Sequence, residues 1–209
     1  MISDAVCRTV TVHAARGTRA IVAPAWFAIG GITLMSVNQS MIFSFIERIG
    51  TERGFGAQVL GVLLTLGFVN LLAPILAALL EPRLLALAVA RGGAILQVAL
   101  AATLAFSSGF AAYAMAGAVF VSVMIFSHTF VFGWLSRHDA SGRAVALTPA
   151  MLMSGAALGP LAGGTLVAAF GIASLGLATI AIGAAAFACF WLAARRSRAL
   201  PAAAPSFSH

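Results

Sequence analysis

The sequence is poor in charge, and it contains no lysine. Only 8% of its 209 residues are charged, whereas a soluble domain usually has about 25%. Hydrophobic residues make up 62% of the chain, and the mean hydropathy is +1.06. A chain of this composition cannot form a water-exposed surface, which excludes a soluble enzyme, a disordered chain and a secreted disulfide scaffold.

Residues that usually carry catalysis or bind metals are also scarce. The two cysteines, Cys7 and Cys189, lie at opposite ends of the chain and have no disulfide or metal-ligand spacing. The five acids all fall in expected loops or at expected helix ends: Asp4, Glu47, Glu52, Glu81 and Asp139. The sequence has no glycine-rich phosphate loop. We therefore expect no enzymatic activity, no cofactor and no metal ion.

Long apolar runs are abundant, and six of them are about 20 residues or longer. This length crosses a hydrocarbon core as a helix, and the runs lack the alternation that a membrane barrel needs. They are Val22–Ile46, Gln58–Leu80, Leu84–Phe106, Phe110–Trp134, Ala146–Leu166 and Ser174–Ala194. Arg91 lies inside the third run, so either that helix starts near Gly92 or Arg91 extends back toward the headgroups. The sequence predicts an all-α membrane protein with six transmembrane helices.

The basic residues are twelve arginines placed between the apolar runs. This pattern argues against a nucleic-acid partner and for an orientation signal within a lipid bilayer. With the N-terminus inside, ten arginines fall on the inner side, and only Arg48 and Arg53 fall on the outer side. We therefore expect both termini to be cytoplasmic. The expected organisation is a cytoplasmic lead-in over residues 1–20, a bundle over 21–195 and a disordered tail over 196–209.

Two segments resemble the major facilitator superfamily of transporters. The stretch SRHDASGRAVALTPAMLMSGAALGPLAGG, residues 136–164, is similar to the region of the tenth and eleventh helices in that family. The stretch NQSMIFSFIERIGTERG, residues 38–54, is similar to the seventh helix and outer loop of bacterial members. The loop ALLEPRLLALAVARGG departs from the family, because it keeps Glu81, Arg83 and Arg91 but lacks the glycines and the tight basic cluster.

The resemblance implies the second six-helix half of a secondary-active transporter in a bacterial cytoplasmic membrane. Such a half would move a small solute by alternating access, together with a second half that is a copy of itself or a separate chain. A truncated remnant is a further alternative within this class. A different class is a non-transporting membrane anchor or assembly subunit.

Polar residues recur in the first span at steps of three or four: Thr33, Ser36, Ser40, Ser44 and Glu47. They share one helix face, which indicates either one side of a hydrated solute path or hydroxyls that bond helix backbones. Glu47 and Arg48 would stand at the outer mouth of such a path, and Gln39 would extend it. Asn38 points the other way, and we expect it to contact a neighbouring helix.

Three more polar side chains fall within the expected spans. Asn70 and Gln97 need hydrogen-bond partners in hydrocarbon, which another helix, water or a solute could supply. His128 is ionisable and shares a face with Gly117, so it is a candidate for proton coupling. The alternative for His128 is a neutral, hydrogen-bonded side chain.

The fifth span contains glycines at four-residue spacing, which predicts close helix packing. The packing residues are Gly155, Gly159, Pro160 and Gly163. Pro160 lacks a backbone donor, so we expect it to kink or loosen the helix. We also expect the glycine face to contribute to association with a partner half.

Overall fold

The computed structural model describes residues 20–139 and 141–199. This part of the chain forms six long helices and one short one: α2 (Ala23–Glu52), α3 (Gln58–Leu80), α4 (Ala86–Phe106), α5 (Phe110–His138), α6 (Arg143–Ala146), α7 (Thr148–Phe170) and α8 (Ala173–Arg198). The six long helices are each long and apolar enough to cross a membrane. The expected all-α fold with six spans is confirmed, and the chain is a multi-span integral membrane protein.

The helix ends differ from the apolar runs where polar residues continue a helix beyond the hydrocarbon. Helix α2 continues to Glu52, and α8 continues to Arg198. Residues 196–198, which we expected in a disordered tail, are therefore helical. Helix α4 begins at Ala86, and the Nε of Arg91 donates to the Leu87 carbonyl one turn earlier, so Arg91 extends back within the helix. The rest of the predicted lead-in and tail lies outside the described residues.

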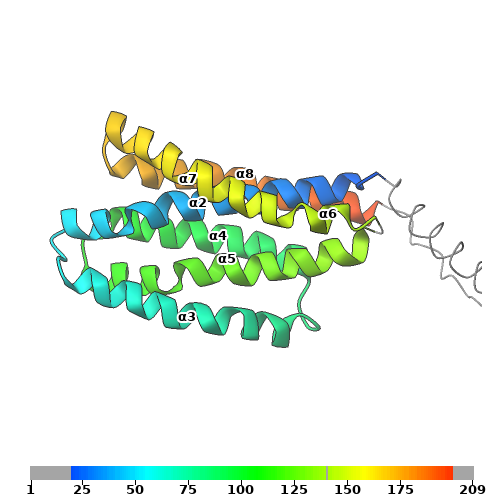
Figure 1. The fold of residues 1–209 in the computed structure, drawn as a ribbon, viewed down its shortest axis with the longest axis horizontal. Coiled ribbons are helices and arrows are strands. Elements are labelled where there is room, and N and C mark those ends of the chain that lie inside the picture. Colours follow the sequence, from blue (N-terminus) through cyan, green and yellow to red (C-terminus); the bar gives the residue numbers. More distant parts are fainter. Residues whose placement is uncertain (1–19, 140, 200–209) are drawn as a thin grey trace, which may run out of the picture.

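The helices pack in a pattern that relates the first three spans to the last three. The most extensive contacts join α2 to α7 and α8, α5 to α3 and α4, and α4 to α8. Exchanging α2 with α5, α3 with α7 and α4 with α8 reproduces this set of contacts. The first repeat therefore consists of α2, α3 and α4, and the second of α5, α7 and α8. Because each repeat contains three spans, the second begins at the opposite end of the bundle from the first. Helices α2 and α5, which touch each other, occupy the middle of this pattern (Figure 1).

Glycine lets the helix backbones approach closely at each of these contacts. A methyl group added to Gly31 would come 2.5 Å from the Phe190 ring, and one added to Gly117 would come 2.7 Å from Val62. The glycines at the main contacts are Gly159 between α2 and α7, Gly31 between α2 and α8, Gly117 between α3 and α5, Gly93 between α4 and α5, and Gly183 between α4 and α8. The bundle is therefore held by close backbone packing, as is usual in lipid.

The two ends of the bundle differ in charge. One end, which we call the arginine-rich end, has seven described arginines against two acids: Arg83, Arg91, Arg137, Arg143, Arg195, Arg196, Arg198, Glu81 and Asp139. The opposite end has Arg48 and Arg53 with two acids. All three tryptophans, Trp26, Trp134 and Trp191, lie within about 10 Å of the helix ends at the arginine-rich end.

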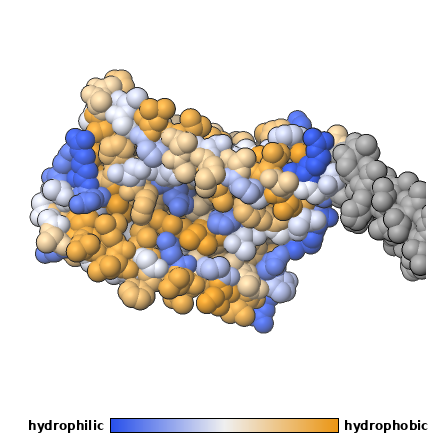
Figure 2. Space-filling model, viewed as in Figure 1, coloured by the Kyte–Doolittle hydropathy of each residue, from blue (hydrophilic) through white to orange (hydrophobic). Residues whose placement is uncertain are grey.

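The sides of the bundle are apolar. Figure 2 shows hydrophobic side chains over much of the middle of one face and hydrophilic residues gathered toward its ends. Helix α3 is the least buried of the six spans, with 22% of its apolar window inside the bundle. Large exposed side chains such as Phe68 and Leu79 follow α3 along its outer side. Lipid contact accounts for this surface, because a water-exposed helix would not present it.

Candidate functional site

The structure places helix α7 across the polar face of α2. The hydroxyl of Ser36 donates to the Leu152 carbonyl of α7 at 3.2 Å, and Ser40 lies against Gly159. Thr33 and Ser44 instead donate to carbonyls one turn earlier in their own helix, at 3.0 and 2.8 Å. Three of the four hydroxyls therefore bond helix backbones. Of the four, only Ser44 is exposed.

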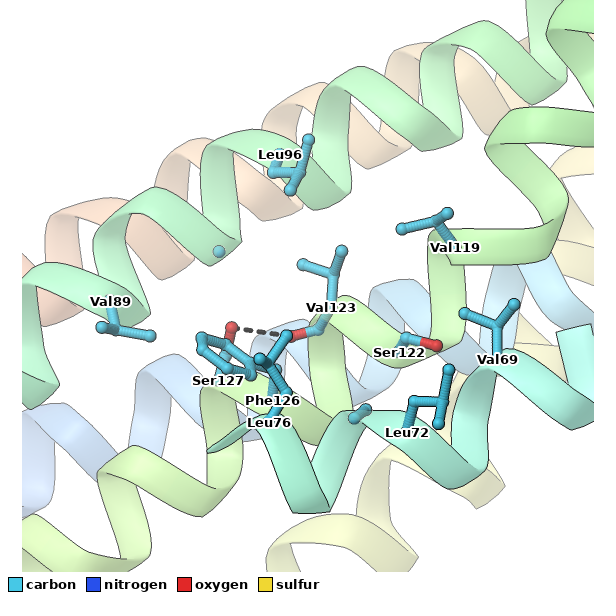
Figure 3. Close-up of a pocket in the computed structure, with 12 residues that line it drawn as sticks. Val69, Leu72, Leu76, Val89, Leu96, Val119, Ser122, Val123, Phe126 and Ser127 are labelled. Carbon is cyan, nitrogen blue, oxygen red and sulfur yellow. Dashed lines mark hydrogen bonds between the residues drawn. The ribbon is translucent and has the colours of Figure 1, made fainter. Parts of the chain in front are cut away.

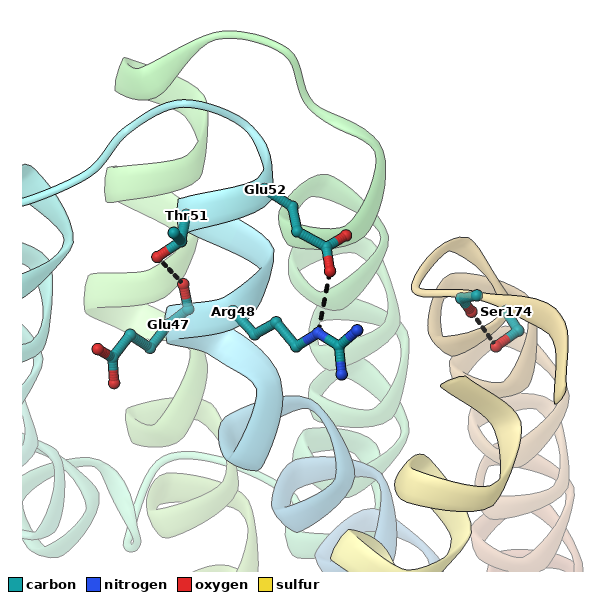
Figure 4. Close-up of polar contacts among 6 residues, drawn as sticks. Glu47, Arg48, Thr51, Glu52 and Ser174 are labelled. Atoms are coloured by element: carbon teal, nitrogen blue, oxygen red, sulfur yellow. Dashed lines mark hydrogen bonds and ion pairs between the residues drawn. The ribbon is translucent and has the colours of Figure 1, made fainter. Parts of the chain in front are cut away.

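The charged residues that follow Ser44 in α2 are exposed at the end of the bundle away from the arginine-rich end. Arg48 pairs with Glu52 at 2.9 Å, one turn later in α2, while Glu47 points away from Arg48 (Figure 4). The Thr51 hydroxyl donates to the Glu47 backbone carbonyl at 3.0 Å. Both side chains of the Arg48–Glu52 pair are about half exposed, so the pair adds little stability. Glu47 and Arg48 thus lie at the end of α2 where the outer mouth was expected, but they do not pair with each other.

Asn38, Gln97 and Thr179 form a buried hydrogen-bonded network between α2, α4 and α8. The Asn38 amide donates to Gln97 Oε1 at 3.3 Å, and the Thr179 hydroxyl donates to Asn38 Oδ1. The Gln97 amide donates in turn to the Met35 carbonyl at 3.2 Å. The expected contact of Asn38 with a neighbouring helix is confirmed. Gln97 is fully buried and hydrogen-bonded within the protein, so it faces no open path in this structure.

Asn70 joins α3 to α5. Its Oδ1 accepts a hydrogen bond of 2.8 Å from the Ser122 hydroxyl. The structure therefore shows interhelical hydrogen bonds for Asn70 and Gln97, as it does for Asn38.

The glycine face of α7 is covered by α2 of the same chain. A methyl group on Gly159 would come 2.6 Å from the Met41 backbone nitrogen, and one on Gly163 would come 2.8 Å from the Phe45 ring. Gly155 lies against Ser36. The expectation that this face serves a partner half is wrong, because α2 already occupies it. Pro160 is exposed and lies off the packing face, and α7 remains helical through it.

Two polar atoms of half-buried residues have no hydrogen-bond partner of normal geometry among the described residues: Gln39 Oε1 and His128 Nδ1. The Met124 carbonyl, one turn earlier in α5, lies near the His128 ring. The His128 ring lies against the Phe132 ring, with the centroids 4.9 Å apart. Gln39 belongs to α2 and His128 to α5, the two central helices of the packing pattern. Unmet polar atoms are costly in an apolar interior, so this pair is the strongest candidate for a functional site.

Gln39 and His128 lie on the faces through which α2 and α5 meet. Ile46 lies on the side of α2 that faces α5. Its carbonyl accepts a hydrogen bond of 2.6 Å from the Tyr113 hydroxyl, and its Cδ1 would lie 3.5 Å from a methyl group added to Gly117. Gln39 precedes Ile46 by two turns on the same face, and His128 follows Gly117 by three turns. Both side chains thus lie on the arginine-rich side of the contact between Ile46 and Gly117. Their positions along the helix axes differ by about 6 Å.

Several of these hydrogen-bond partners could not be predicted from the sequence. Thr179, Ser122 and Tyr113 were not among the candidate residues, although each donates a hydrogen bond to another helix. Their importance depends on which helices become neighbours, and a single sequence does not state that. A hydroxyl in the middle of an apolar run is the only local signal that could have marked them.

None of the protein-family models, curated proteins or solved structures compared with the chain matches it.

Proposed function

We propose that this chain is one half of a secondary-active transporter of the major facilitator type, which moves a small solute together with a second six-helix half. The observation that carries the proposal is the pair of unpartnered polar atoms, Gln39 Oε1 and His128 Nδ1, on the two central helices. A polar group of a solute, or water accompanying it, would meet both hydrogen-bonding needs.

The arrangement of the helices supports the same proposal. Two repeats of three spans with opposite orientation, with substrate sites near the midplane where repeats or halves meet, are characteristic of this transporter class. Here α2 and α5 are the first helices of the two repeats, and they carry Gln39 and His128. The second half would be a copy of this chain or a separate chain, and it would form the other side of the site. His128 is the candidate for proton coupling within this proposal.

The proposed setting is a bacterial cytoplasmic membrane with the arginine-rich end in the cytoplasm. The excess of arginine at that end supports this orientation. Ser44, Glu47 and Arg48 would then lie at the outer mouth, where they are exposed.

Thiol accessibility tests the proposed path. Cysteine replaces Gln39, His128 or Ser44 in a chain whose Cys7 and Cys189 are changed to serine, and a membrane-impermeant thiol reagent is added to vesicles containing the chain. We expect Ser44→Cys and Gln39→Cys to react, because a solute path is hydrated. Cysteine at Ala101, which is fully buried, is the control that stays protected. Protection of both Gln39→Cys and His128→Cys on both sides of the membrane would contradict the path.

A static membrane bundle, as in an anchor or assembly subunit, is the second candidate. The closed network of Asn38, Gln97 and Thr179 favours it, because these groups are satisfied inside the protein. Thermal stabilisation by a panel of sugars, amino acids and organic acids separates the two. A transporter half shows a stabilising solute whose effect is lost in Gln39→Ala and kept in Thr33→Ala, since Thr33 bonds only its own helix.

A further inference from the structure

An apolar groove of about 510 Å³ opens on the side of the bundle between α3 and α4, with α5 as its floor (Figure 3). Helices α3 and α4 each pack against α5, while their contact with each other is minor. The lining is Val69, Leu72, Ala73 and Leu76 of α3, Val89, Gly93 and Leu96 of α4, and Val119, Ser122, Val123, Phe126 and Ser127 of α5. A membrane-spanning chain presents such a groove to lipid.

The polar atoms in this lining have no unmet hydrogen bonds. Ser122 donates to Asn70 Oδ1 at 2.8 Å, and Ser127 donates to the Val123 carbonyl of its own helix at 2.7 Å. The groove therefore offers only apolar contact, which suits a hydrocarbon chain and not a polar solute. From Val119 to Ser127 it extends about 12 Å along α5, close to the half-thickness of a hydrocarbon core of about 30 Å.

The loop that joins the two walls of the groove carries an arginine. Arg83 lies in the segment between Leu80, where α3 ends, and Ala86, where α4 begins. Leu76 and Val89 of the lining are each about one turn from these helix ends. The nearby carboxylate of Glu81 is bound by Arg137 of α5 at 2.6 Å.

Arg83 itself is exposed and forms no ion pair with any described acid. The groove thus lies between two helices joined by a loop whose Arg83 forms no ion pair with a described acid. We propose that this groove binds an anionic phospholipid of the leaflet at the arginine-rich end, with one acyl chain along α5 and the phosphate at Arg83. The site needs only that the chain spans a membrane, so it stands independently of the proposed transport.

Photolabelling in vesicles tests the site. The full chain is placed in phosphatidylcholine vesicles that contain a minor fraction of phosphatidylglycerol with a photoreactive acyl chain, and the labelled residues are mapped by mass spectrometry. A parallel sample carries photoreactive phosphatidylcholine. We expect phosphatidylglycerol to label the groove residues of α3, α4 and α5 preferentially. Equal labelling by the two lipids would overturn the anionic headgroup, and even labelling of all six helices would overturn the site.

Matched variants separate the headgroup from the acyl chain. Arg83→Gln should reduce the preference for phosphatidylglycerol about fivefold, whereas Arg198→Gln at the same end should keep it. Val119→Phe and Leu96→Phe fill the groove and should reduce labelling by both lipids, whereas Leu60→Phe, on α3 outside the groove, should not. An unchanged preference in Arg83→Gln, or a second copy of the chain cross-linked through the groove, would overturn the proposal.

Discussion

Asp139 ties the end of α5 to the start of α6. Its carboxylate accepts hydrogen bonds from the Ser141 amide at 3.0 Å, the Ser141 hydroxyl at 2.6 Å and the Ala144 amide at 2.6 Å. Burial alone would raise the pKa of Asp139, but these hydrogen bonds and the nearby Arg143 outweigh it and hold the pKa below its ordinary value. The ionised carboxylate is therefore the form that holds this loop.

Asp139→Ala should loosen the loop by about 1 kcal/mol, the usual cost of removing a capping acceptor. Faster hydrogen exchange of the Ala144 amide would report the change. Because the folded-state pKa is depressed, the wild-type contribution is present above the ordinary pKa of aspartate, near 3.8. It is lost as the pH falls through the lower folded value. Identical exchange in variant and wild type at neutral pH would contradict this role.

Asn38 and Gln39 are neighbours in sequence with opposite environments. Asn38 is fully buried and bonded to Gln97 and Thr179, whereas Gln39 Oε1 has no partner among the described residues. Asn38→Ala leaves Gln97 and Thr179 without their hydrogen-bond partner and should lower the free energy of unfolding by about 1–2 kcal/mol. Gln39→Ala removes no such bond and should cost less. Unfolding by sodium dodecyl sulfate in mixed micelles measures both, and equal losses would contradict the network.

At the scale of the helix, α7 depends on its glycines for contact with α2. A methyl group on Gly159 would come 2.6 Å from the Met41 nitrogen and 2.8 Å from the Val37 carbonyl oxygen. Backbone atoms cannot move aside as a flexible side chain can, so Gly159→Ala should cost about 1–3 kcal/mol. Unfolding in mixed micelles measures this loss.

Gly164 is the matched control in the same helix, because nothing lies within 4 Å of a methyl group added there. Gly164→Ala should be neutral or stabilising by up to about 1 kcal/mol, since alanine favours the helix. A loss at Gly164 equal to that at Gly159 would show that the two glycines act through helix propensity and not through the contact.

The helices could be predicted from the sequence, but their contacts could not. Hydropathy marked the spans within a few residues, and it placed the end of the third span at Phe106, where α4 ends. It ended the first span at Ile46, whereas α2 continues to Glu52, because polar residues outside the hydrocarbon can extend a helix.

The neighbours of each helix face are set by contacts far apart in the chain. Gln97 was a candidate for the solute path, yet it is bonded to Asn38, 59 residues away. The polar face of α2 was predicted from its spacing, but the crossing of α7 over Ser36 was not. The unmet atoms of Gln39 and His128 likewise emerge only when α2 and α5 are placed together.

At the scale of the whole molecule, the charge difference between the two ends predicts the topology. Reporter fusions after Arg53, Arg143 and Arg198 should report outside, inside and inside. Arg143 and Arg198 share the arginine-rich end, while Arg53 lies at the opposite end. A fusion after Arg198 that reports outside would contradict this orientation.

Under the proposed function, the chain should not transport alone. We expect the purified chain either to be unstable as a monomer or to associate, because the polar side chains proposed for the site, such as Gln39, would otherwise lack the opposing half of that site. A two-fold pair is the simplest assembly if the partner is a second copy. The mass of the protein in mild detergent, measured by light scattering, tests association. A stable monomer that takes up solute in vesicles would contradict the prediction.

Because the tryptophans lie at one end of the bundle, their fluorescence can report the orientation of the chain in the membrane. Trp26, Trp134 and Trp191 all lie near the arginine-rich end, so tryptophan emission from the unmodified protein originates in one leaflet. Lipids carrying bromine in that leaflet alone should quench the emission, while the same lipids in the other leaflet should leave it bright. The direction in which the chain has inserted can therefore be read without attaching a dye.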